Sequence, residues 1–464
     1  MLKLYNTMTR SMETFRPLHG NAARIYNCGP TVYNYPHIGN YRAYVAADIL
    51  RRYLKYSGYD VTQVTNITDV DDKTIRDSQK AGIPLNQFTE RYTKIFFDEL
   101  KMLNIEKAEH YPRATEHISE MVALIKKLLD KGYAYKGEDG SVYFSIAKFK
   151  DYGKLSHLKA EELKIGASGV RVDEYGKENA RDFVLWKAWT PEDGDVFWET
   201  EIGKGRPGWH IECSAMSTKY LGETLDIHMG GVDLIFPHHE NEIAQSEAAT
   251  GKQFSRFWVH NEHVLVDGEK MSKSKGNFYT LSDVLKKVPD PTAMRFVLMA
   301  THYRKQLNFT FGELETAKKT VERLNDFMAR LDEVTATYGR DMLAEISEAE
   351  EKFKAAMDDD LSTPAAIAAV FDFVGKANYA MEGKAMSKDG AKKVRQTLLK
   401  FDKVLGILRQ EKEVIPPEVK KLAQEREAAR KKKDWATSDK LRNAIKDLGW
   451  IVEDTLTGFR LRKA

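Results

Sequence analysis

Cysteine is nearly missing from this chain, which has two in 464 residues. That count excludes a disulfide framework and a compact zinc finger built on paired cysteines. Long apolar runs are missing as well, and none approaches the roughly 20 residues that a membrane-spanning helix requires. The first residues also lack the basic and then apolar pattern of a signal peptide. We therefore expect a cytoplasmic protein with no membrane partner.

An excess of charge of one sign is absent too. The 72 Lys and Arg residues nearly balance the 69 Asp and Glu residues, for a formal net charge of +3. The overall balance therefore does not identify a nucleic-acid-binding protein, and only local clusters of charge can do so. The composition, 42% hydrophobic and 30% charged, is typical of a globular protein, and the length requires three or four units rather than one core.

The stretch from Cys28 to Asn40 (Cys-Gly-Pro-Thr-Val-Tyr-Asn-Tyr-Pro-His-Ile-Gly-Asn) lies between a short predicted strand and a predicted helix. Apolar residues at helical spacing up to Tyr56 indicate that helix. A helix N-terminus has unpaired N–H groups and a partial positive charge, which suit a polyphosphate. Gly39 would let a nucleotide approach the backbone closely. The stretch therefore predicts a phosphate site, with Cys28 as a soft metal ligand close by.

Strand and helix patterns alternate in the first part of the chain. A β-branched, alternating segment at residues 60–68 predicts a strand, and helical patterns follow at 84–104 and 115–131. This order is typical of a parallel, doubly wound sheet of Rossmann type, in which ligands bind at the carboxyl ends of the strands. At residues 132–205 short alternating pieces lie among glycines and charges, so we expect an insertion there.

After the insertion the strand and helix patterns resume. We expect a helix ending near Leu221, a strand and glycine turn at residues 225–233, and a helix at residues 236–247 with Pro237 at its start. A basic loop bounded by glycines follows at residues 267–277.

The last third of the chain is predicted to be mostly helical. Helical periodicity from residue 311 to 406, with one break near Gly383, predicts a helical bundle. A charged helical stretch at residues 419–448 and a β-hairpin at 450–462 predict a small α+β tail domain. We therefore divide the chain into a catalytic α/β domain in two parts (1–131 and 206–265), the insertion (132–205), a loop junction (266–310), the bundle (311–408) and the basic tail (416–464).

Cys28, Cys213, His238 and Glu242 are candidate ligands of one metal ion. His238 and Glu242 are four residues apart on a predicted helix, so both project from one face. His239 is a competing ligand, but it points about 100° away on a helix with 3.6 residues per turn. Two thiolates favour zinc over magnesium. The alternative is that both cysteines are buried as small hydrophobic residues and that the His-His-Glu sequence is a solvated helix face.

Two short motifs point to a nucleotide. His37-Ile-Gly-Asn40 is a weak match alone, whereas Lys270-Met-Ser-Lys-Ser274 places two lysines and two hydroxyls in one loop. Lysine carries a point charge on a flexible stem, which suits a phosphate group whose charge moves. A Lys/Ser loop alone is usually a solvated turn, but both motifs in this order in one chain form a much more specific signal.

With these motifs the chain resembles the class I aminoacyl-tRNA synthetases, whose signatures are His-Ile-Gly-His and Lys-Met-Ser-Lys-Ser. It resembles the cysteinyl-tRNA synthetases in particular, at residues 28–33, 66–73, 208–216 and 236–246, and the similarity covers essentially the whole chain. The resemblance implies that cysteine and ATP give cysteinyl-adenylate and pyrophosphate, after which the 3′ end of tRNA(Cys) accepts the cysteine. Asn40 departs from the general signature, and an amide cannot supply a charged imidazole there.

The resemblance implies one zinc ion per chain, bound by the four candidate ligands, and Mg²⁺ bound with ATP. The zinc would bind the thiolate of cysteine and so reject serine. The implied catalytic residues are His37, Asn40, Lys270 and Lys273, and the implied ATP-binding residues are His37, Gly39, Asn40, Asp233, Lys270, Ser272, Lys273 and Ser274. The implied residues around cysteine or its adenylate are Cys28, Gly29, Thr31, Thr68, Trp209 and His228, although Trp209 could instead be a core residue and His228 a structural histidine.

The resemblance also implies that the bundle and the tail bind tRNA, and we expect a monomer. Trp435 and Trp450 would stack on unpaired bases. Cations of the tail would bind phosphates, namely Arg426, Arg430, Lys431, Lys432, Lys433, Lys440, Arg442, Arg460 and Arg462. The alternative is a solvated helix face, because acidic residues such as Glu425 and Asp439 dilute the positive charge.

Two other functions stay open. The zinc-dependent ligase that joins cysteine to an amino sugar in mycothiol synthesis shares these motifs, but a small acceptor would not require the long helical region and basic tail after Lys305. A non-catalytic RNA-binding or zinc-sensing paralogue would not require an intact His37, Gly39, Lys270 and Lys273.

Overall fold

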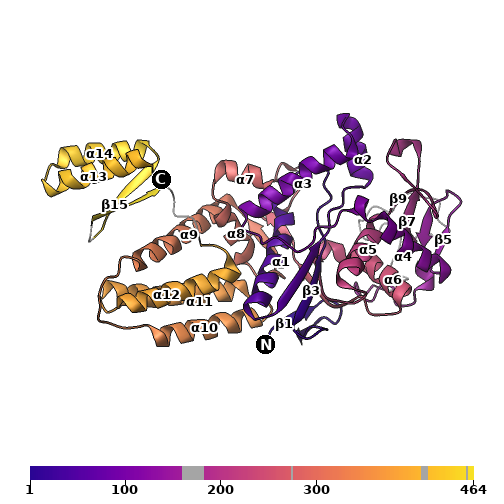
Figure 1. The fold of residues 1–464 in the computed structure, drawn as a ribbon, viewed down its shortest axis with the longest axis horizontal. Helices are drawn as coiled ribbons and strands as arrows, with labels where there is room; N and C mark the ends of the chain where they lie inside the picture. Colours follow the sequence, from indigo (N-terminus) through magenta and orange to yellow (C-terminus); the bar gives the residue numbers. More distant parts are fainter. Residues whose placement is uncertain (159–181, 273–274, 409–415, 456–457, 464) are drawn as a thin grey trace. The chain divides into compact units, whose positions relative to one another are not determined.

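The computed structural model describes residues 1–158, 182–272, 275–408, 416–455 and 458–463 (Figure 1). The chain forms two compact units, Met1–Leu408 and Arg409–Ala464. The first unit contains the α/β domain, the insertion and the helical bundle, and the second is the tail. Among the helices of the described residues, none combines the length and the apolar content that crossing a bilayer requires.

A four-stranded parallel sheet in the order β11-β10-β3-β4 forms the centre of the first unit (Figure 1). The chain runs outward from β3 to β4, returns through the insertion to β10 beside β3, and runs outward again to β11. This order confirms the doubly wound fold, with the switch point between β3 and β10. The strands are β3 (Ala22–Asn27), β4 (Asp60–Thr65), β10 (Leu225–Gly231) and β11 (Ser255–Asn261).

Successive strand residues face opposite layers, as in any parallel sheet that is buried on both sides. Ile25 packs in the large core that α1 shares, whereas Tyr26 packs in a smaller core with Cys213 of α5. Phe257 and Trp258 divide between the two cores in the same way. The helices of this domain are α1 (Ile38–Tyr56), α2 (Asp72–Ala81), α3 (Leu85–Met102), α4 (Ile118–Asp130), α5 (Trp209–Leu221) and α6 (Glu240–Thr250).

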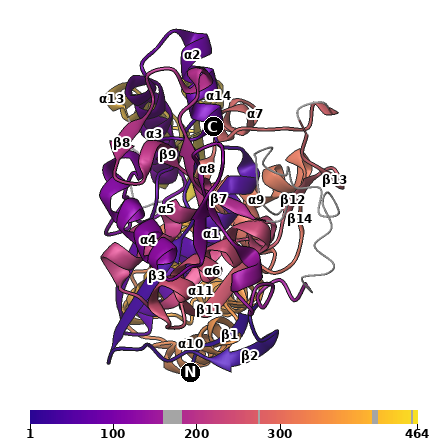
Figure 2. The same cartoon turned by 90° about the vertical axis from the view of Figure 1, so that its right-hand side faces the viewer.

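The insertion contains a five-stranded antiparallel sheet in the order β5-β6-β7-β9-β8, and Figure 2 shows the view toward it. Its strands are β5 (Ala134–Lys136), β6 (Val142–Phe144), β7 (Phe183–Ala188), β8 (Trp198–Thr200) and β9 (Gly203–Pro207). Residues 159–181 of the expected insertion lie outside the described residues. A hairpin of β1 (Lys3–Asn6) and β2 (Ser11–Thr14), which the sequence patterns did not predict, precedes the sheet.

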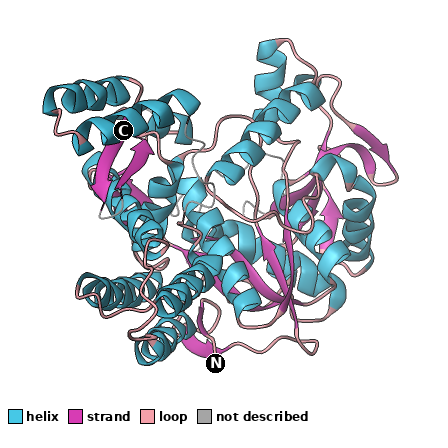
Figure 3. Cartoon of the chain, turned by 60° about the vertical axis from the view of Figure 1, so that its left-hand side comes forward, coloured by secondary structure: helices cyan, strands magenta, loops and turns pink. Residues whose placement is uncertain are grey.

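Four helices form the bundle, and Figure 3 shows them as a helical layer. They are α9 (Phe311–Leu331), α10 (Leu343–Asp358), α11 (Thr363–Glu382) and α12 (Lys388–Leu405). The helical periodicity was expected to break only near Gly383, but breaks also occur between α9 and α10 and between α10 and α11. The preceding junction holds β12 (Val264–Val266), β13 (Glu269–Lys270), α7 (Leu281–Lys287), α8 (Pro291–Ala300) and β14 (Leu307–Phe309).

The helix expected from Phe236 begins later in the structure. Phe236 has extended dihedrals (φ −134°, ψ 131°), as residues before proline prefer, and the Phe236–Pro237 peptide bond is cis. A π-helical turn, Ile235–His239, then leads into α6, whose first residue is Glu240. The prediction that Pro237 lies at the first position of a regular α-helix was therefore wrong.

The tail unit has two helices and a hairpin: α13 (Pro417–Lys431), α14 (Trp435–Asp447), β15 (Trp450–Thr455) and β16 (Gly458–Lys463). The single charged helical stretch expected here is interrupted at Lys433, which has a left-handed backbone with φ of 60°. Val419 and Ala423 of α13, Ile445 of α14 and Trp450 of β15 form a small core of this unit. The hairpin was expected in this place from the sequence.

Candidate functional site

A cavity of about 530 Å³ opens where β3 and β10 end, at the switch point of the sheet. Ligands of doubly wound sheets bind at this position. The cavity is lined by many of the predicted site residues: Cys28, Gly29, Thr31, His37, Gly39, Asn40, Trp209, Asp233 and Lys270. Both signature motifs therefore contribute to one cavity.

Other predicted site residues lie apart from the cavity wall. Thr68, Cys213, His228, His238 and Glu242 are each at most 1% exposed and do not line the cavity. Ser272 lies in the basic loop, where its N–H donates to Asn277 Oδ1 at 2.8 Å. Lys273 and Ser274 lie outside the described residues, so their predicted roles stay predictions.

The first signature motif forms the start of α1, as expected. His37 is the N-cap residue: its Nδ1 accepts from Asn40 N–H at 3.3 Å, and Asn40 Oδ1 accepts from His37 N–H at 3.0 Å. This reciprocal pair caps the first turn of α1 beside the cavity, which His37, Gly39 and Asn40 line. Asn40 therefore caps the start of α1 through its side-chain amide oxygen, whereas a histidine there would have only ring nitrogens to offer.

The structure gives a different reason for glycine at position 39 from the one expected. A Cβ atom at Gly39 would lie 2.7 Å from Met271 Cε and 3.0 Å from the His37 ring. Met271 belongs to the second signature motif, and the Ile38 N–H donates to Tyr279 O at 3.0 Å just beyond that motif. Glycine therefore lets the two signature motifs pack against each other. The expected close approach of a nucleotide to Gly39 stays a prediction.

The four candidate metal ligands converge in the structure. The ligand atoms of Cys28, Cys213, His238 and Glu242 all lie within 4.8 Å of one another. Cys28 follows β3, Cys213 lies on α5, and His238 and Glu242 lie at the start of α6 with Nε2 and Oε1 3.0 Å apart. The expected common face of His238 and Glu242 therefore exists.

A second ligand set overlaps the first one. Cys28, His228, His239 and Glu242 also place their ligand atoms within 4.8 Å of one another. His239 Nε2 lies 3.3 Å from Cys28 Sγ and 3.9 Å from Glu242 Oε1. The argument that His239 points away was therefore wrong, because the backbone before Glu240 is a π-helical turn and Cys28 enters from another element. Only the first set has two thiols, and it therefore suits zinc better.

The charges of the cluster suit a divalent cation. Burial raises the pKa of Glu242, but His228 and then His238 outweigh it and hold the pKa at about 2, so the carboxylate is ionised. Burial also raises the pKa of Cys213, but its contact with the Cys28 thiol and then with His238 brings it to about 6. Burial lowers the pKa of His238, yet Glu242 and Cys213 raise it to about 10. A metal ion would displace that proton, since ligating histidine is neutral.

Trp209 and His210, at the start of α5, both contact His238 of the metal cluster. Trp209 is 43% exposed and lines the cavity, so the alternative of a core tryptophan does not hold. Its ring lies 4.2 Å from the ring of His238, centroid to centroid. His210, which the sequence did not single out, places its Nδ1 2.8 Å from His238 Nδ1. This contact leaves Nε2 of His238 for the ligand cluster.

Thr68 and His228 reach the site only through other side chains. Thr68 Oγ1 donates to Glu212 Oε2 at 2.7 Å and accepts from Asn66 Nδ2 at 3.2 Å. His228 Nε2 lies 2.9 Å from Glu242 Oε2, and its ring stacks on Trp258 at 4.5 Å. The predicted direct contact of Thr68 and His228 with substrate is therefore not supported by their placement. Glu212 and Asn66 are distant from each other in sequence, and both lie in passages that carry the family resemblance (66–73 and 208–216), but no role was predicted for either.

Gly29 touches this same network and cannot carry a side chain. Its N–H donates to Asn66 Oδ1 at 2.8 Å, and a Cβ atom would lie 1.6 Å from the Asn66 carbonyl oxygen. The backbone of Thr31, which follows β3, forms a parallel β-bridge with the backbone of Thr68, which follows β4. The segments after β3 and β4 are thus held at backbone contact distance.

We therefore predict that Gly29→Ala lowers the free energy of unfolding by about 3 kcal/mol or more, because the new methyl group forces two backbone segments apart. Urea denaturation would measure the change. The matched control is Gly375→Ala, since a Cβ atom at Gly375 in α11 meets no heavy atom within 4 Å. Equal stability of Gly29→Ala and the parent protein would contradict this packing.

Asp233, Lys270 and Lys73 complete the charged part of the cavity wall. Asp233 follows the glycines that end β10, where a Cβ atom at Gly231 would lie 2.4 Å from Asp233 Oδ1. Lys270 is the last residue of β13 and is exposed. Lys73, which the sequence analysis did not assign to the site, places its Nζ 5.0 Å from the centre of the Tyr33 ring. Lys73 ends the passage 66–73, which carries part of the family resemblance.

The tail offers fewer free groups than its sequence suggested. Arg426 is 2% exposed and its Nη1 lies 2.7 Å from Asp454 Oδ1, and Arg430 also pairs with Asp454. Trp450 is 6% exposed because it belongs to the core, so it cannot stack on a base as predicted. Trp435 is 59% exposed. The side chains of Arg460 and Arg462 lie outside the described residues.

Comparisons with known proteins agree with this geometry. The family described as tRNA synthetases class I (C) catalytic domain matches residues 14–319, the DALR domain matches 352–409, and the cysteinyl-tRNA ligase anticodon binding domain matches 413–461. The cysteine–tRNA ligase of Protochlamydia amoebophila is 49% identical over 469 residues, covering 100% of this chain and 98% of that protein. That of Methanosarcina acetivorans is 49% identical over 474 residues, covering 100% and 99%.

Solved structures share the fold at much lower sequence identity. Mycobacterium tuberculosis methionyl-tRNA synthetase in complex with methionyl-adenylate superposes with a TM-score of 0.61 at 17% identity, covering 84% of this chain and 90% of that chain. A putative arginyl-tRNA synthetase from Campylobacter jejuni gives 0.55 at 15% identity, covering 86% and 94%. These likenesses support the class I architecture.

Proposed function

The chain belongs to the family of class I cysteine–tRNA ligases, and from this premise we propose that it activates cysteine with ATP and transfers it to tRNA(Cys), choosing cysteine through a zinc ion. The observation that carries the zinc proposal is the convergence of Cys28, Cys213, His238 and Glu242 directly behind the cavity that both signature motifs line. Zinc bound there supplies a soft Lewis acid that prefers a thiolate to a hydroxyl.

The pocket for the amino acid is formed by residues of this chain on three sides. Cys28 and Gly29 lie at the end of β3, and Trp209 covers the other side as an exposed wall. Thr31 offers a hydroxyl at the cavity surface, suited to the amino or carboxylate group of cysteine. Thr68 acts as a positioning residue, because its hydroxyl holds Glu212 beneath this wall.

The nucleotide would occupy the part of the cavity between the two signature motifs. The N-terminus of α1, capped by His37 and Asn40, offers N–H groups to phosphate oxygens, and Asp233 lies where a ribose hydroxyl can donate to it. Lys270 and Lys273, together with Mg²⁺ bound to ATP, would stabilise the charge on pyrophosphate as it leaves. Ser272 and Ser274 would add hydroxyl donors.

The acceptor of the second step is tRNA, and the chain has the parts for it. The DALR match covers the end of α10 and all of α11 and α12, and the anticodon-binding match covers most of the tail. A ligase with a small acceptor would not require these parts, which argues against the amino-sugar ligase. A monomer in the cytoplasm is the arrangement that we propose for this enzyme.

The deciding experiment is ATP–pyrophosphate exchange with cysteine and with serine, with and without tRNA(Cys). We expect exchange with cysteine without tRNA, no detectable exchange with serine, and charging of tRNA(Cys) when it is added. Exchange that serine supports as well as cysteine would refute selection by zinc. Absence of exchange with any amino acid would refute catalysis and favour a non-catalytic paralogue.

A truncation tests the role of the tail. A chain that ends at Leu408 retains the whole first unit, so we expect exchange within about twofold of the full chain and a loss of tRNA charging of at least about tenfold, since anticodon contacts are removed. Steady-state charging and exchange rates would measure both values. Unchanged charging by the truncated chain would contradict the role of the tail.

A further inference from the structure

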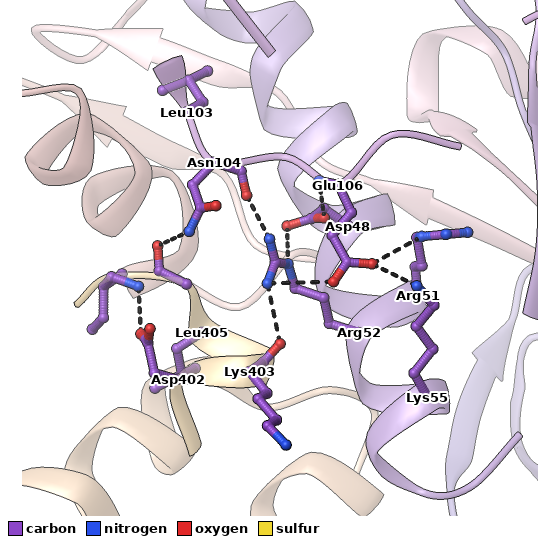
Figure 4. A network of polar contacts seen from close by, with 12 residues as sticks. Asp48, Arg51, Arg52, Lys55, Leu103, Asn104, Glu106, Asp402, Lys403 and Leu405 are labelled. Carbon is purple, nitrogen blue, oxygen red and sulfur yellow. Dashed lines mark hydrogen bonds and ion pairs between the residues drawn. The ribbon is translucent and has the colours of Figure 1, made fainter. Parts of the chain in front are cut away.

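A buried network of charges lies away from the cavity and holds α1 against the end of the bundle. Asp48 of α1 is 1% exposed, and Arg295 of α8 is 0% exposed. Asp48 Oδ2 accepts from Arg295 Nη2 at 2.6 Å and from Arg52 Nε at 2.8 Å, and Asp48 Oδ1 accepts from the Glu106 N–H at 2.8 Å. One carboxylate therefore joins two guanidinium groups and a loop backbone, and Figure 4 shows Asp48, Arg52 and Glu106 of this network.

One further donor of each guanidinium group binds a carbonyl group at the end of α12. Arg52 Nη1 donates to Lys403 O at 3.2 Å (Figure 4). Arg295 Nε donates to Leu405 O at 2.7 Å. The last carbonyl groups of a helix have no partner within it and carry partial negative charge, so two buried cations suit this end. Asp402 completes the end by accepting from the N–H groups of Ile407 and Leu408, at 2.6 and 2.9 Å.

The loop after α3 is tied to the same point. Arg52 Nη2 donates to Asn104 O at 2.7 Å, and Arg295 Nη1 donates to Leu103 O and Asn104 O at 3.0 and 3.1 Å. Asn104 Nδ2 in turn donates to Gly406 O at 2.9 Å. Gly406 has φ of 65°, and a Cβ atom there would lie 3.0 Å from Arg295 Nε. The contact leaves no room for a side chain on the α12 end.

Stability alone does not account for this arrangement. Burying ions costs free energy, and well-packed apolar residues in place of a buried ion pair are often as stable or more so. What hydrogen-bonded charges provide instead is direction, because each donor must meet a given carbonyl group. The network therefore fixes both the rotation and the axial position of the α12 end on α1.

The two ends of this connection carry different parts of the reaction. α1 begins at His37, eleven residues before Asp48, which is about 16 Å along a helix with a 1.5 Å rise per residue. α12 ends at Leu405, and Leu408 is the last residue of the first unit before the chain continues to the tail. Tyr53 Oη of α1 also donates to Asp358 Oδ1 of α10 at 2.8 Å. α1 thus links the signature motif with the bundle.

We propose that Asp48, Arg52 and Arg295 are positioning residues for the transfer of cysteine to tRNA. By fixing the end of α12 on α1, they set where the tRNA-binding part of the chain begins relative to the His37 end of α1. This rests on the proposed function, because it takes the bundle and the tail as tRNA-binding. Formation of the adenylate uses only groups around the cavity, so we expect it not to depend on the position of the α12 end on α1.

Arg52→Lys and Asn104→Gly test the proposal in the full chain. Lysine keeps the charge but loses the fork that reaches Lys403 O and Asn104 O, and glycine accommodates the φ of 51° at Asn104 while removing the bond to Gly406 O. We expect kcat for tRNA charging to fall about tenfold for Arg52→Lys and less for Asn104→Gly, since a small misplacement is costly in catalysis. The KM for tRNA and the ATP–pyrophosphate exchange rate should stay within about twofold.

The control variant is Arg395→Lys, on the same helix but ten residues before its last residue, Leu405; there Arg395 Nε pairs with Asp332 at 3.2 Å on the surface. It should leave charging and exchange unchanged. If the exchange rate of Arg52→Lys falls in step with its charging rate, the role of the network is merely structural and the proposal is overturned. Charging at the parent rate in both Arg52→Lys and Asn104→Gly would overturn it too. Failure of the parent protein itself to charge tRNA would instead refute the proposed function.

Discussion

Cys213→Ser is expected to release the metal ion and to reduce cysteine activation by at least about a hundredfold, because even the outer partners of a metal site cost 10- to 100-fold when they are changed. Cys213 is a thiol of the first ligand set only, and a serine hydroxyl is a poor ligand for zinc at neutral pH. The measurements are the metal content of the purified variant by mass spectrometry and ATP–pyrophosphate exchange with cysteine.

His239→Gln is the matched control, because His239 belongs only to the second ligand set. We expect this variant to keep its zinc and to lose activity only modestly, through its contact with Cys28. The opposite pattern, in which His239→Gln loses the metal and Cys213→Ser keeps it, would assign the ion to Cys28, His228, His239 and Glu242. Retention of selectivity against serine by a metal-free, folded variant would refute the zinc mechanism itself.

Lys270→Ala and Lys273→Ala are expected to slow adenylate formation by about a hundred- to a thousandfold each, the range found when one preorganised donor to a developing charge is removed. Lys273→Ala should have the larger effect, because it matches the second lysine of the family signature. Zinc content should not change, since neither lysine belongs to the candidate ligand set. Rapid-quench measurement of the first turnover separates this step from tRNA charging.

Lys275→Ala serves as the control in the same loop. Lys275 Nζ is paired with Glu269 Oε2 at 2.9 Å, so its charge is already compensated within the loop. It should reduce the rate by less than about threefold, the scale of an exposed ion pair. A rate for Lys273→Ala equal to that of Lys275→Ala would remove Lys273 from the mechanism.

Features that depend on local spacing could be predicted from the sequence. His37 and Asn40 lie at the start of α1 because a capping pair three residues apart is a local property, and His238 and Glu242 share a face because they are four residues apart. The parallel, doubly wound sheet followed from the order of strand and helix patterns. These arguments needed no knowledge of distant contacts.

Features that depend on distant contacts could not be predicted in the same way. His239 reaches Cys28 because the turn before Glu240 departs from regular helix geometry. Thr68 is turned to Glu212, which lies 144 residues further along the chain. Arg426 and Trp450 were expected to be exposed groups that bind tRNA. Instead, Arg426 pairs with Asp454, and Trp450 is buried in the core of the tail. In each case a partner far along the chain decides where the side chain points.

The two faces of the central sheet differ in how they are held together. The face under α1 packs against a large apolar core, whereas the face under α5 and α6 has a smaller apolar core that includes Cys213 and adjoins the buried residues His228, His238, His239 and Glu242. On that face, binding of the proposed zinc ion would supply part of the stabilisation that apolar contacts supply elsewhere, so we expect metal affinity and folding to be coupled there. We would then expect a shortage of zinc to destabilise this one layer of the protein before it limits the binding of cysteine.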